Sequence, residues 1–315
     1  MFDDPLSEIL AFVGARCEVA GGFTAGGDWG IRFPRPDAIK FGVVAAGACW
    51  MRVDGLAAPQ TLQAGDVFFV KGDRAFDLLS DLDVAPLDAR EVFRDAPDSM
   101  ASLGDGTDVL YLGGHVELDE MRRELLLDEL PPVIHVAGNS EHAAGLQWLA
   151  REVVAEVQNK QAGAGLSTAS LAQLLFVRVL RAHLESGGRA NIGWLRGLGD
   201  PRIARVIALM HSDPARNWHL GDLAKAAGMS RSVLAARFKA VCGVPPLTYL
   251  TDWRMRLAVR ALEDGSMPVS KIAETLGYTS VSAFSNAFKR VTGTSPKRFQ
   301  FGTGETERSP GGIGP

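Results

Sequence analysis

The feature that most restricts the fold is an internal repeat between Leu220 and Phe299. The first copy is LGDLAKAAGMSRSVLAARFKAVCGVPP, and the second is VSKIAETLGYTSVSAFSNAFKRVTGTSP. Equivalent positions lie 49 residues apart before the turn and 50 apart from the serines onward, because the second copy has one extra turn residue. A pattern repeated at this period predicts that one supersecondary unit is built twice.

Each copy predicts a short apolar helix, a turn at a glycine, a serine cap and a second helix. Gly228 and Gly277 mark the turns, and Ser230 and Ser280 are the caps. The predicted buried positions of the second helices are Leu234, Phe238, Val241, Phe284 and Phe288. Two helices joined in this way form a helix-turn-helix, whose second helix fits the major groove of DNA.

Charge is divided unevenly along the chain. Residues 200–300 contain 15 Lys and Arg against 7 Asp and Glu, whereas the other residues contain 18 against 30. The net charge of −4 conceals this difference. A basic segment joined to an acidic one is typical of a nucleic-acid-binding module attached to a module that avoids nucleic acid.

Four motifs follow one another within residues 200–300: LAKAAGMSRSVLAARFK, WRMRLAVRAL, IAETLGYTSVSAFSNAFKR and GTSPKRF. In order and spacing they resemble the DNA-binding domain of the AraC/XylS family of transcription regulators. The resemblance implies an all-α domain with two helix-turn-helix units that bind double-stranded promoter DNA. It also implies RNA polymerase as a partner if the protein is an activator.

The solvent faces of the two second helices are the candidate DNA-binding surfaces. Helical spacing places on them Arg231, Ser232, Ala235, Ala236, Lys239, Val281, Ser282, Ser285, Asn286, Lys289 and Arg290. By resemblance, Ala236 and Asn286 occupy positions where family members often have a base-contacting Arg. Because Asn pairs with adenine and Ser with several bases, Asn286, Ser282 and Ser232 are the predicted specificity positions.

The basic residues on and near these helices have two open interpretations. Arg237, Lys239, Lys289, Arg290, Lys297 and Arg298 are predicted phosphate or structural partners. Arg237 and Arg254 are equally compatible with a structural role, paired with acidic neighbours that hold the two units together. Between the units, Pro246–Asp264 has no helix breaker and predicts one helix of about 25–30 Å. That length approaches one duplex turn of about 34 Å.

The N-terminal half has a different texture. Residues 1–20 predict a short helix, and from Gly21 to about Val136 short apolar runs alternate with turn signals, which indicates an antiparallel sandwich. The runs GACWMRV, LQAGDVFFV and LPPVIHV resemble the cupin sensor domain found on one branch of the same regulator family. The predicted fold class is therefore α+β: a cupin-like antiparallel β-sandwich with a helical hairpin, followed by an all-α double helix-turn-helix domain.

Residues 140–186 have helical periodicity and predict an αα-hairpin. The apolar stripes are Leu146, Leu149, Val153 and Val157, then Leu171, Leu174, Leu175, Val179 and Leu180. In related regulators such helices make the contact of a homodimer. The alternative, in which the hairpin only covers the sheet, is equally compatible with the pattern.

The expected organisation has four parts: a sensor and dimerisation domain (1–186), a linker (187–199), the DNA-binding domain (200–300) and a disordered tail (301–315). The acidic N-terminus has no signal or transit pattern, and no apolar run approaches the length of a membrane helix. Three widely spaced cysteines predict buried thiols. The expected compartment is the cytoplasm, without membrane association.

No catalytic, metal or cofactor site is predicted. The two cupin motif regions lack histidine, with Phe41 and Phe76 at positions where histidine ligands are expected, and no catalytic triad or phosphate loop occurs. Trp29, Phe33, Phe41 and Trp50 are the candidate lining of a pocket for a small-molecule effector. The predicted function is a sequence-specific transcription regulator. The alternatives are a cupin-type enzyme with an added helical domain and a non-specific architectural DNA-binding protein.

Overall fold

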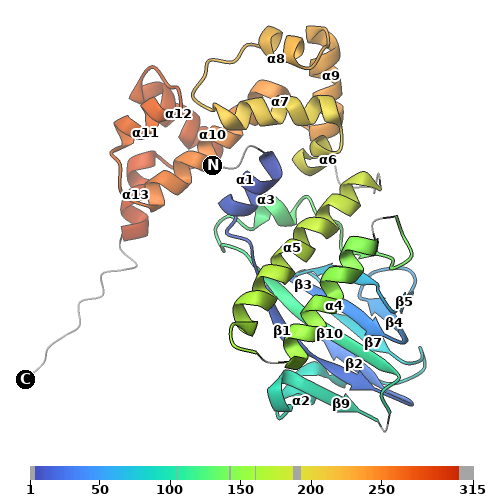
Figure 1. The fold of residues 1–315 in the computed structure, drawn as a ribbon. Helices are drawn as coiled ribbons and strands as arrows, with labels where there is room; N and C mark the ends of the chain where they lie inside the picture. The colour runs from blue at the N-terminus through green and yellow to red at the C-terminus, as the bar shows by residue number, and fades with distance from the viewer. Residues whose placement is uncertain (1–3, 105, 142, 160, 187–192, 305–315) are drawn as a thin grey trace, which may run out of the picture. The chain divides into compact units, whose positions relative to one another are not determined.

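The computed structural model describes residues 4–104, 106–141, 143–159, 161–186 and 193–304. The chain divides into two compact units, one formed by residues 7–191 and the other by residues 192–315 together with residues 1–6. The N-terminal unit is rich in strands and the C-terminal unit is helical (Figure 1). This confirms the predicted α+β class.

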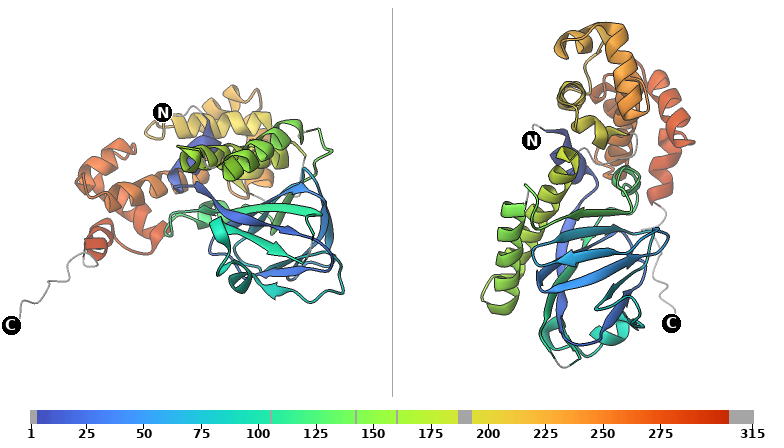
Figure 2. Two further views of the ribbon diagram at one scale, coloured as in Figure 1. Left: turned by 60° about the horizontal axis from the view of Figure 1, so that its bottom comes forward. Right: turned by 90° about the vertical axis from the view of Figure 1, so that its right-hand side faces the viewer.

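Two sheets form the N-terminal unit (Figure 2). The larger sheet contains, in spatial order, β11 (Val133–Val136), β6 (Val67–Lys71), β3 (Ile39–Ala46), β10 (Val109–Glu117), β1 (Arg16–Ala25) and β9 (Met100–Leu103). In the smaller are β5 (Gln60–Gln63), β4 (Ala48–Val53), β7 (Phe76–Leu79), β2 (Gly30–Phe33) and β8 (Leu87–Asp88). The pairs β1–β9 and β2–β8, at one edge of each sheet, are parallel. The other pairs are antiparallel, as predicted.

The larger sheet has two apolar faces. Phe68 points into the sandwich, where its ring centroid lies 6.2 Å from that of Tyr111. The next residue, Phe69, points to the other face and lies 5.4 Å from Phe176 of the helical hairpin. Phe41 shares this outer face, 5.7 Å from Phe69. Because side chains alternate along a strand, one sheet can support both the sandwich core and the helices.

The hairpin consists of α4 (Ala143–Asn159) and α5 (Ala164–Glu185), and it packs on the larger sheet (Figure 2). Leu175, Val179 and Leu180 are buried as predicted, but Leu174 is 42% exposed. The buried stripe of α5 runs through Ala172, Leu175, Phe176 and Val179, and at about 100° per residue Leu174 points about 200° away from Ala172, toward solvent. The hairpin therefore covers the sheet, and its part in dimerisation stays a prediction.

The turn in LQAGDVFFV is held by a buried carboxylate. Asp66 accepts hydrogen bonds from the backbone N–H groups of Gln63 at 3.0 Å and Gly138 at 2.7 Å. His135 Nε2 lies 2.9 Å from the same carboxylate. Asp66 thus joins the start of β6 to the end of β11, which gives the AGD motif a structural role.

The N-terminal helix is shorter than predicted. Helix α1 spans Pro5–Phe12, Gly14 follows with a φ of 62°, and β1 begins at Arg16. The prediction of helix up to residue 20 was wrong because buried Cys17 and exposed Glu18 begin an alternation with the period of a strand. Short elements that the sequence did not predict are α2 (Ala89–Phe93), the 3-10 helix η1 (Pro97–Ser99) and α3 (Glu124–Leu127).

The described part of the C-terminal unit consists of helices and their connections. The helices are α6 (Trp194–Leu198), α7 (Pro201–Ser212), α8 (Leu220–Ala226), α9 (Arg231–Cys242), α10 (Pro246–Glu263), α11 (Val269–Thr275), α12 (Val281–Thr292) and α13 (Pro296–Gly304). The first helix-turn-helix is α8 and α9, and the second is α11 and α12. Helix α10 is the predicted long helix between them.

Two segments expected to be irregular are partly helical. In the expected linker, residues 187–192 lie outside the described residues, whereas residues 194–198 form α6. Trp194 and Leu195 are buried in the unit, which favours a helix there over an extended linker. In the expected tail, residues 301–304 complete α13, and residues 305–315 lie outside the described part of the chain.

The repeat is visible in individual hydrogen bonds. In the first turn the Met229 N–H donates to the Ala224 carbonyl at 2.9 Å, and in the second the Tyr278 N–H donates to the Ala273 carbonyl, also at 2.9 Å. Both second helices end at a glycine in the left-handed conformation. The equivalence therefore extends to the backbone.

The structure extends the repeat past the motifs that defined it. The ring of Phe238 contacts that of Tyr249 edge to face, with centroids 5.7 Å apart. Phe288 and Phe299 make the same contact at 5.7 Å. The start of α10 therefore packs on the first helix-turn-helix in the same way as α13 packs on the second. Tyr249 and Phe299 keep the 50-residue offset of the repeat, but the residues around them differ, so the sequence analysis did not include Tyr249.

Helix α10 belongs to both helical cores. Leu250 packs in the core of the first helix-turn-helix, and Met255 and Leu262 pack in the core of the second. Between them Trp253 stacks on His211 of α7, with ring centroids 4.0 Å apart and an interplanar angle of 4°. The predicted core role of Trp253 is confirmed by its burial. The two cores are therefore held on one rigid element.

The two turn glycines provide a matched test. Gly228 (φ 63°) has open space where a Cβ would be, whereas a Cβ on Gly277 (φ 79°) would clash with the Ala215 carbonyl oxygen. We expect Gly228→Ala to destabilise by about 1–2 kcal/mol, the cost of a left-handed alanine. Gly277→Ala should cost clearly more, as measured by urea unfolding followed by helical circular dichroism. Equal costs would contradict the close approach at Gly277.

Candidate nucleic-acid interface

Helices α9 and α12 begin at the predicted serine caps. Ser230 Oγ accepts a hydrogen bond from the Val233 N–H at 3.3 Å, and Ser280 Oγ accepts one from the Ala283 N–H at 3.1 Å. The buried anchors are Leu234, Phe238, Phe284 and Phe288, each with 0% exposure. With one side of each helix fixed in a core, the opposite side is presented to solvent.

On α9 the structure places the predicted residues on this solvent side. Arg231, Ser232, Ala236 and Lys239 are exposed, and Ala235 is half-buried. Ser232 Oγ lies 3.2 Å from Ser230 Oγ, so its hydroxyl is oriented by the cap. The sequence missed Val233, which is 52% exposed beside them. Its position three residues after the capping serine was the available signal.

On α12 the predicted face divides into an uncharged half and a basic half. Val281, Ser282 and Asn286 are exposed and Ser285 is half-buried in the first turns, and Lys289 and Arg290 are exposed in the last turn. Cations in the last turn also complement the helix dipole. In helix-turn-helix proteins the N-terminal residues of this helix contact base edges, so the uncharged half is suited to that contact.

Arg237 is tied to α7. Its Nε donates to Asp200 Oδ2 at 2.6 Å, and Asp200 also caps α7 by accepting from the Arg202 N–H at 3.1 Å. Burial alone would raise the pKa of Asp200, but the hydrogen bonds from Arg237 and two backbone N–H groups outweigh it and lower that pKa. The predicted acidic partner is present, but it joins α9 to α7 instead of joining the two helix-turn-helix units.

Arg254 of α10 connects the two helix-turn-helix halves of the C-terminal unit. One terminal nitrogen donates to the Arg216 carbonyl at 2.8 Å and Nε donates to the Pro214 carbonyl, both in the loop after α7. The guanidinium also lies 5.7 Å from the ring centroid of Tyr278 in the second turn. The partners are backbone carbonyls and an aromatic ring where acidic side chains were predicted. Arg254 therefore positions the second turn relative to the first half.

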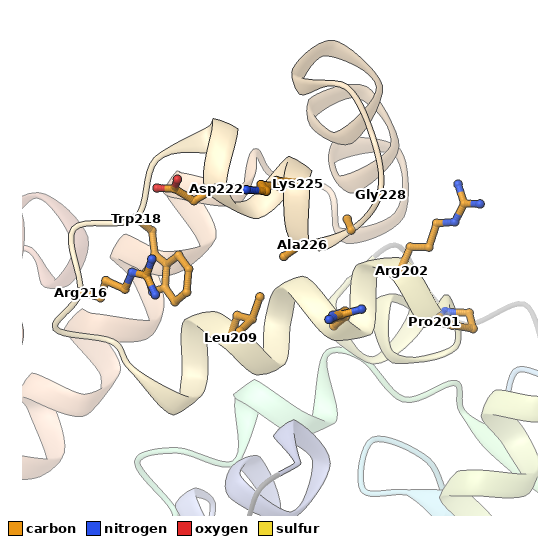
Figure 3. Close-up of a pocket in the computed structure, with 11 residues that line it drawn as sticks. Pro201, Arg202, Leu209, Arg216, Trp218, Asp222, Lys225, Ala226 and Gly228 are labelled. Carbon is orange, nitrogen blue, oxygen red and sulfur yellow. The ribbon is translucent and has the colours of Figure 1, made fainter.

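A basic groove of about 860 Å³ lies between α7 and α8 (Figure 3). Its charged lining residues are Arg202, Arg205, Arg216, Lys225 and Asp222, and its apolar ones include Leu209 and Trp218. The Arg216 guanidinium lies 4.0 Å from the Trp218 ring centroid, which holds it in place. The sequence missed this groove because its cations come from two helices and a loop. Its surplus of positive charge is suited to anionic partners such as phosphate.

In the N-terminal unit the four predicted effector aromatics do not gather. Trp29 and Phe33 lie in the sandwich core. Phe41 is on the outer face of the larger sheet, against the hairpin. Trp50 is half-buried, and its strand neighbour Met51 points into the core instead. Aromatic content alone cannot show which face of a strand a residue occupies.

The structure brings together Glu18, His115 and Glu117, a set that the sequence did not predict. His115 Nε2 lies 3.4 Å from a Glu18 oxygen and 3.6 Å from a Glu117 oxygen. The glutamate side chains are 67% and 62% exposed. The arrangement is explained as an imidazole between two solvated carboxylates.

The three cysteines, Cys17, Cys49 and Cys242, are buried thiols, as predicted. Burial raises the pKa of Cys17 and of Cys49 to about 12. Thiols in this state are poor nucleophiles. Among the described residues, no helix is both long and apolar enough to span a bilayer.

Known proteins resemble both units. A family described as Cupin matches residues 4–185, and one described as Helix-turn-helix domain matches residues 223–300. The chain is 43% identical over 293 residues to a protein of Streptomyces lividans named as an AraC-like transcription regulator, covering 93% of this chain and 96% of that protein. It is 27% identical over 285 residues to the HTH-type transcriptional regulator AlkR of Acinetobacter baylyi, covering 87% and 91%.

Among solved structures, the DNA-binding domain of AdpA in complex with a target DNA is 30% identical. The match covers 36% of this chain and 99% of that chain, with a TM-score of 0.33.

Arg237 and Lys239 separate a structural role from a surface role. We expect Arg237→Ala to destabilise the protein by about 1–2 kcal/mol at pH 7, because it removes a charged hydrogen bond to Asp200. Lys239→Ala should change the free energy of unfolding by less than about 0.5 kcal/mol. Urea unfolding of both variants measures this.

The pH dependence of that difference follows from Asp200. Its pKa is lowered on folding, so its stabilisation is present above the ordinary value of 3.8 and is lost as the pH falls below it. The Arg237→Ala effect should therefore be full at pH 7 and diminish below about pH 4. An effect of equal size for Lys239→Ala, or one independent of pH, would contradict the assignment.

Proposed function

The chain belongs to the AraC-like family of transcription regulators, and from this premise we propose that α9 and α12 enter successive major grooves on one face of a DNA duplex. The protein is a DNA-binding regulator with a cupin domain and a helix-turn-helix domain. The observation that carries the proposal is the shared helix α10. Its 18 residues span about 27 Å, somewhat less than one duplex turn of about 34 Å, and its two ends pack in the cores of different helix-turn-helix units.

We propose that base contacts come from the uncharged N-terminal halves of the two helices. Asn286 and Ser282 on α12 and Ser232 on α9 are the specificity positions, because their side chains offer donors and acceptors that fit base edges. Arg231, at the start of α9, is the proposed guanine contact, because an Arg side chain can pair with guanine O6 and N7. Val281, Ala235 and Ala236 have methyl groups that suit the thymine methyl group.

We assign the phosphate contacts to Lys239, Lys289 and Arg290, and we place Ser285 close to the DNA backbone. These cations are exposed and follow the base-contacting turns along each helix. Phosphate contacts fix the orientation of the protein without specifying sequence. Helix α9 presents few cations and no extended set of base-reading side chains. Non-specific architectural binding is therefore one of the outcomes that the tests below distinguish.

The cupin unit is proposed to regulate DNA binding and to have no enzymatic activity. Phe41 and Phe76 occupy the motif positions where a cupin enzyme would have metal ligands; Phe41 packs toward the hairpin and Phe76 is fully buried. We propose a small-molecule effector for this unit. A homodimer through the hairpin is supported by Trp148 and Leu166, which are 53% and 78% exposed.

Two partners and a compartment complete the proposal. RNA polymerase is the expected further partner if the protein activates transcription. The proposed location is the cytoplasm, where a regulator meets promoter DNA and where buried cysteine thiols stay reduced.

A first test uses residues 195–301 alone. The two helical cores and the positive balance of this segment are internal to it, so we expect it to fold and to bind duplex DNA. The affinity should fall steeply with salt concentration, because several phosphates release counterions. A folded fragment that does not bind duplex DNA at low salt would overturn the proposed function.

A second test compares Asn286→Ala with Lys289→Ala in the full chain. Asn286→Ala should relax preference at one base position by about 1–3 kcal/mol and leave the salt dependence nearly unchanged. Lys289→Ala should weaken all sequences alike and reduce the salt slope by about one. Binding to a randomised half-site at several salt concentrations measures both. If Asn286→Ala weakens every sequence equally, Asn286 is not a specificity residue.

A further inference from the structure

The basic groove between α7 and α8 is not used by the proposed DNA contacts. Its two walls are these helices, and Arg216 and Trp218 lie at the end opposite Arg202 (Figure 3). The residues proposed to contact DNA belong to α9 and α12, and none of them lines the groove. The groove is therefore a second binding surface to be explained on the same unit.

Helical spacing sets the α7 wall of the groove in a row. Arg202, Arg205 and Leu209 are three and then four residues apart, so they lie within about 60° of one another on one side of α7. At about 1.5 Å per residue the row from Arg202 to Leu209 is roughly 10 Å long. Lys225 adds a cation from α8, and Arg216 adds one from the loop. Cations distributed along a groove suit an elongated anionic partner better than one isolated phosphate.

The positive charge of the groove is available to a partner. Arg202, Arg205 and Lys225 are exposed, and none of the three forms a salt bridge with a residue in the described part of the chain. The acidic residue of the lining, Asp222, accepts a hydrogen bond from the His219 N–H at 3.3 Å and so caps α8. Its carboxylate is therefore engaged at the helix end, and the cations keep their charge for an incoming anion.

The groove also has an apolar lining. Leu209 and Ala226 are half-buried, and Trp218 and Ala227 belong to the core of the first helix-turn-helix. A phosphate backbone gains little from apolar surface. An amphipathic helix buries its apolar side chains on such a surface and pairs its carboxylates with the cations beside it. The combination of charge and apolar surface therefore favours an acidic protein segment over a nucleic acid.

We propose that the α7–α8 groove docks a short acidic helical segment of a partner protein. Carboxylates three or four residues apart on that helix pair with Arg202, Arg205 and Lys225. The apolar side chains next to them pack on Leu209 and Ala226. Because the groove does not overlap the solvent faces of α9 and α12, the partner binds while DNA is bound. The inference goes beyond the proposed function and does not depend on sequence-specific DNA contacts.

The test is fluorescence anisotropy of labelled synthetic peptides titrated with the full chain. The probe is a peptide of about 15 residues, long enough to form a helix, with Leu at helical spacing and Glu at most other positions. One control peptide has Gln in place of each Glu, and a second has Ala in place of each Leu. We expect the Glu–Leu peptide to bind, and each control to bind at least about tenfold more weakly, because one loses the charge pairing and the other the apolar contact. No binding of the Glu–Leu peptide at about 0.1 mM protein, or equal binding of either control, overturns the proposal.

Charge-reversed variants locate the binding site. Arg205→Glu and Lys225→Glu each change one wall of the groove, and the matched control Arg260→Glu changes an exposed arginine of α10 outside the groove and outside the DNA-facing surfaces. All three change the net charge equally, so a difference among them reports position. We expect each groove variant to weaken the Glu–Leu peptide at least about tenfold and Arg260→Glu to weaken it less than about twofold. Because these side chains are exposed, the variants should keep the helical circular dichroism of the unaltered chain. Equal weakening by Arg260→Glu, or unchanged binding in both groove variants, overturns the proposal.

Duplex DNA distinguishes the groove from the proposed DNA-binding faces. A duplex of random sequence with a second fluorophore is added at low salt to the chain that already carries the labelled peptide. We expect the duplex to bind and the anisotropy of the peptide to stay at or above its value before the addition. A fall to the value of free peptide as the duplex binds would place the peptide on the DNA-binding faces and overturn the proposal. A chain that binds the peptide but no duplex would overturn the proposed function and leave the docking groove supported.

Discussion

The geometry of the DNA-binding unit depends on one helix that is shared by two cores. Leu250 anchors α10 in the first helix-turn-helix, and Met255 and Leu262 anchor it in the second. The stack of Trp253 on His211 and the hydrogen bonds of Arg254 fix its rotation and position relative to α7. Because a helix is stiff over this length, the separation of the two candidate DNA-binding faces is set by covalent structure and packing. A flexible connection would instead leave that separation to the DNA.

Local signals within the repeat are sufficient for most of its secondary structure. Serine caps, left-handed glycines and aromatic anchors act within a few residues, and both copies obey them. The same residue type can still have a different structural role in each copy of the repeat. Gly228 is needed for its backbone angle alone, whereas Gly277 also lets the Ala215 carbonyl approach. That approach couples the second turn to the loop after α7, where Arg254 makes its contacts.

In the cupin unit, local sequence signals predict the strands but do not predict which side chains lie together. Its alternating runs predicted the strands, yet the predicted effector aromatics Trp29, Phe33, Phe41 and Trp50 lie on different faces of the sheets. Which face of a strand each of these residues occupies depends on the pleat and on the register between strands. Apolar packing therefore determines the fold of this unit, and only the folded unit shows which polar side chains lie close together.

By itself the sequence determined the repeat, the caps and turns of both helix-turn-helix units, the long helix between them, the basic character of residues 200–300 and the order of most cupin strands. These are properties of spacing and composition, and they act over short distances. It misplaced the end of α1, the helical residues of the expected linker and tail, and Leu174. Only the tertiary structure decided the partners of Arg237 and Arg254, the groove between α7 and α8, and the contacts of His115 with Glu18 and Glu117. Each joins residues far apart in the chain, and the free energy of such contacts depends on burial and direction that a linear pattern does not contain.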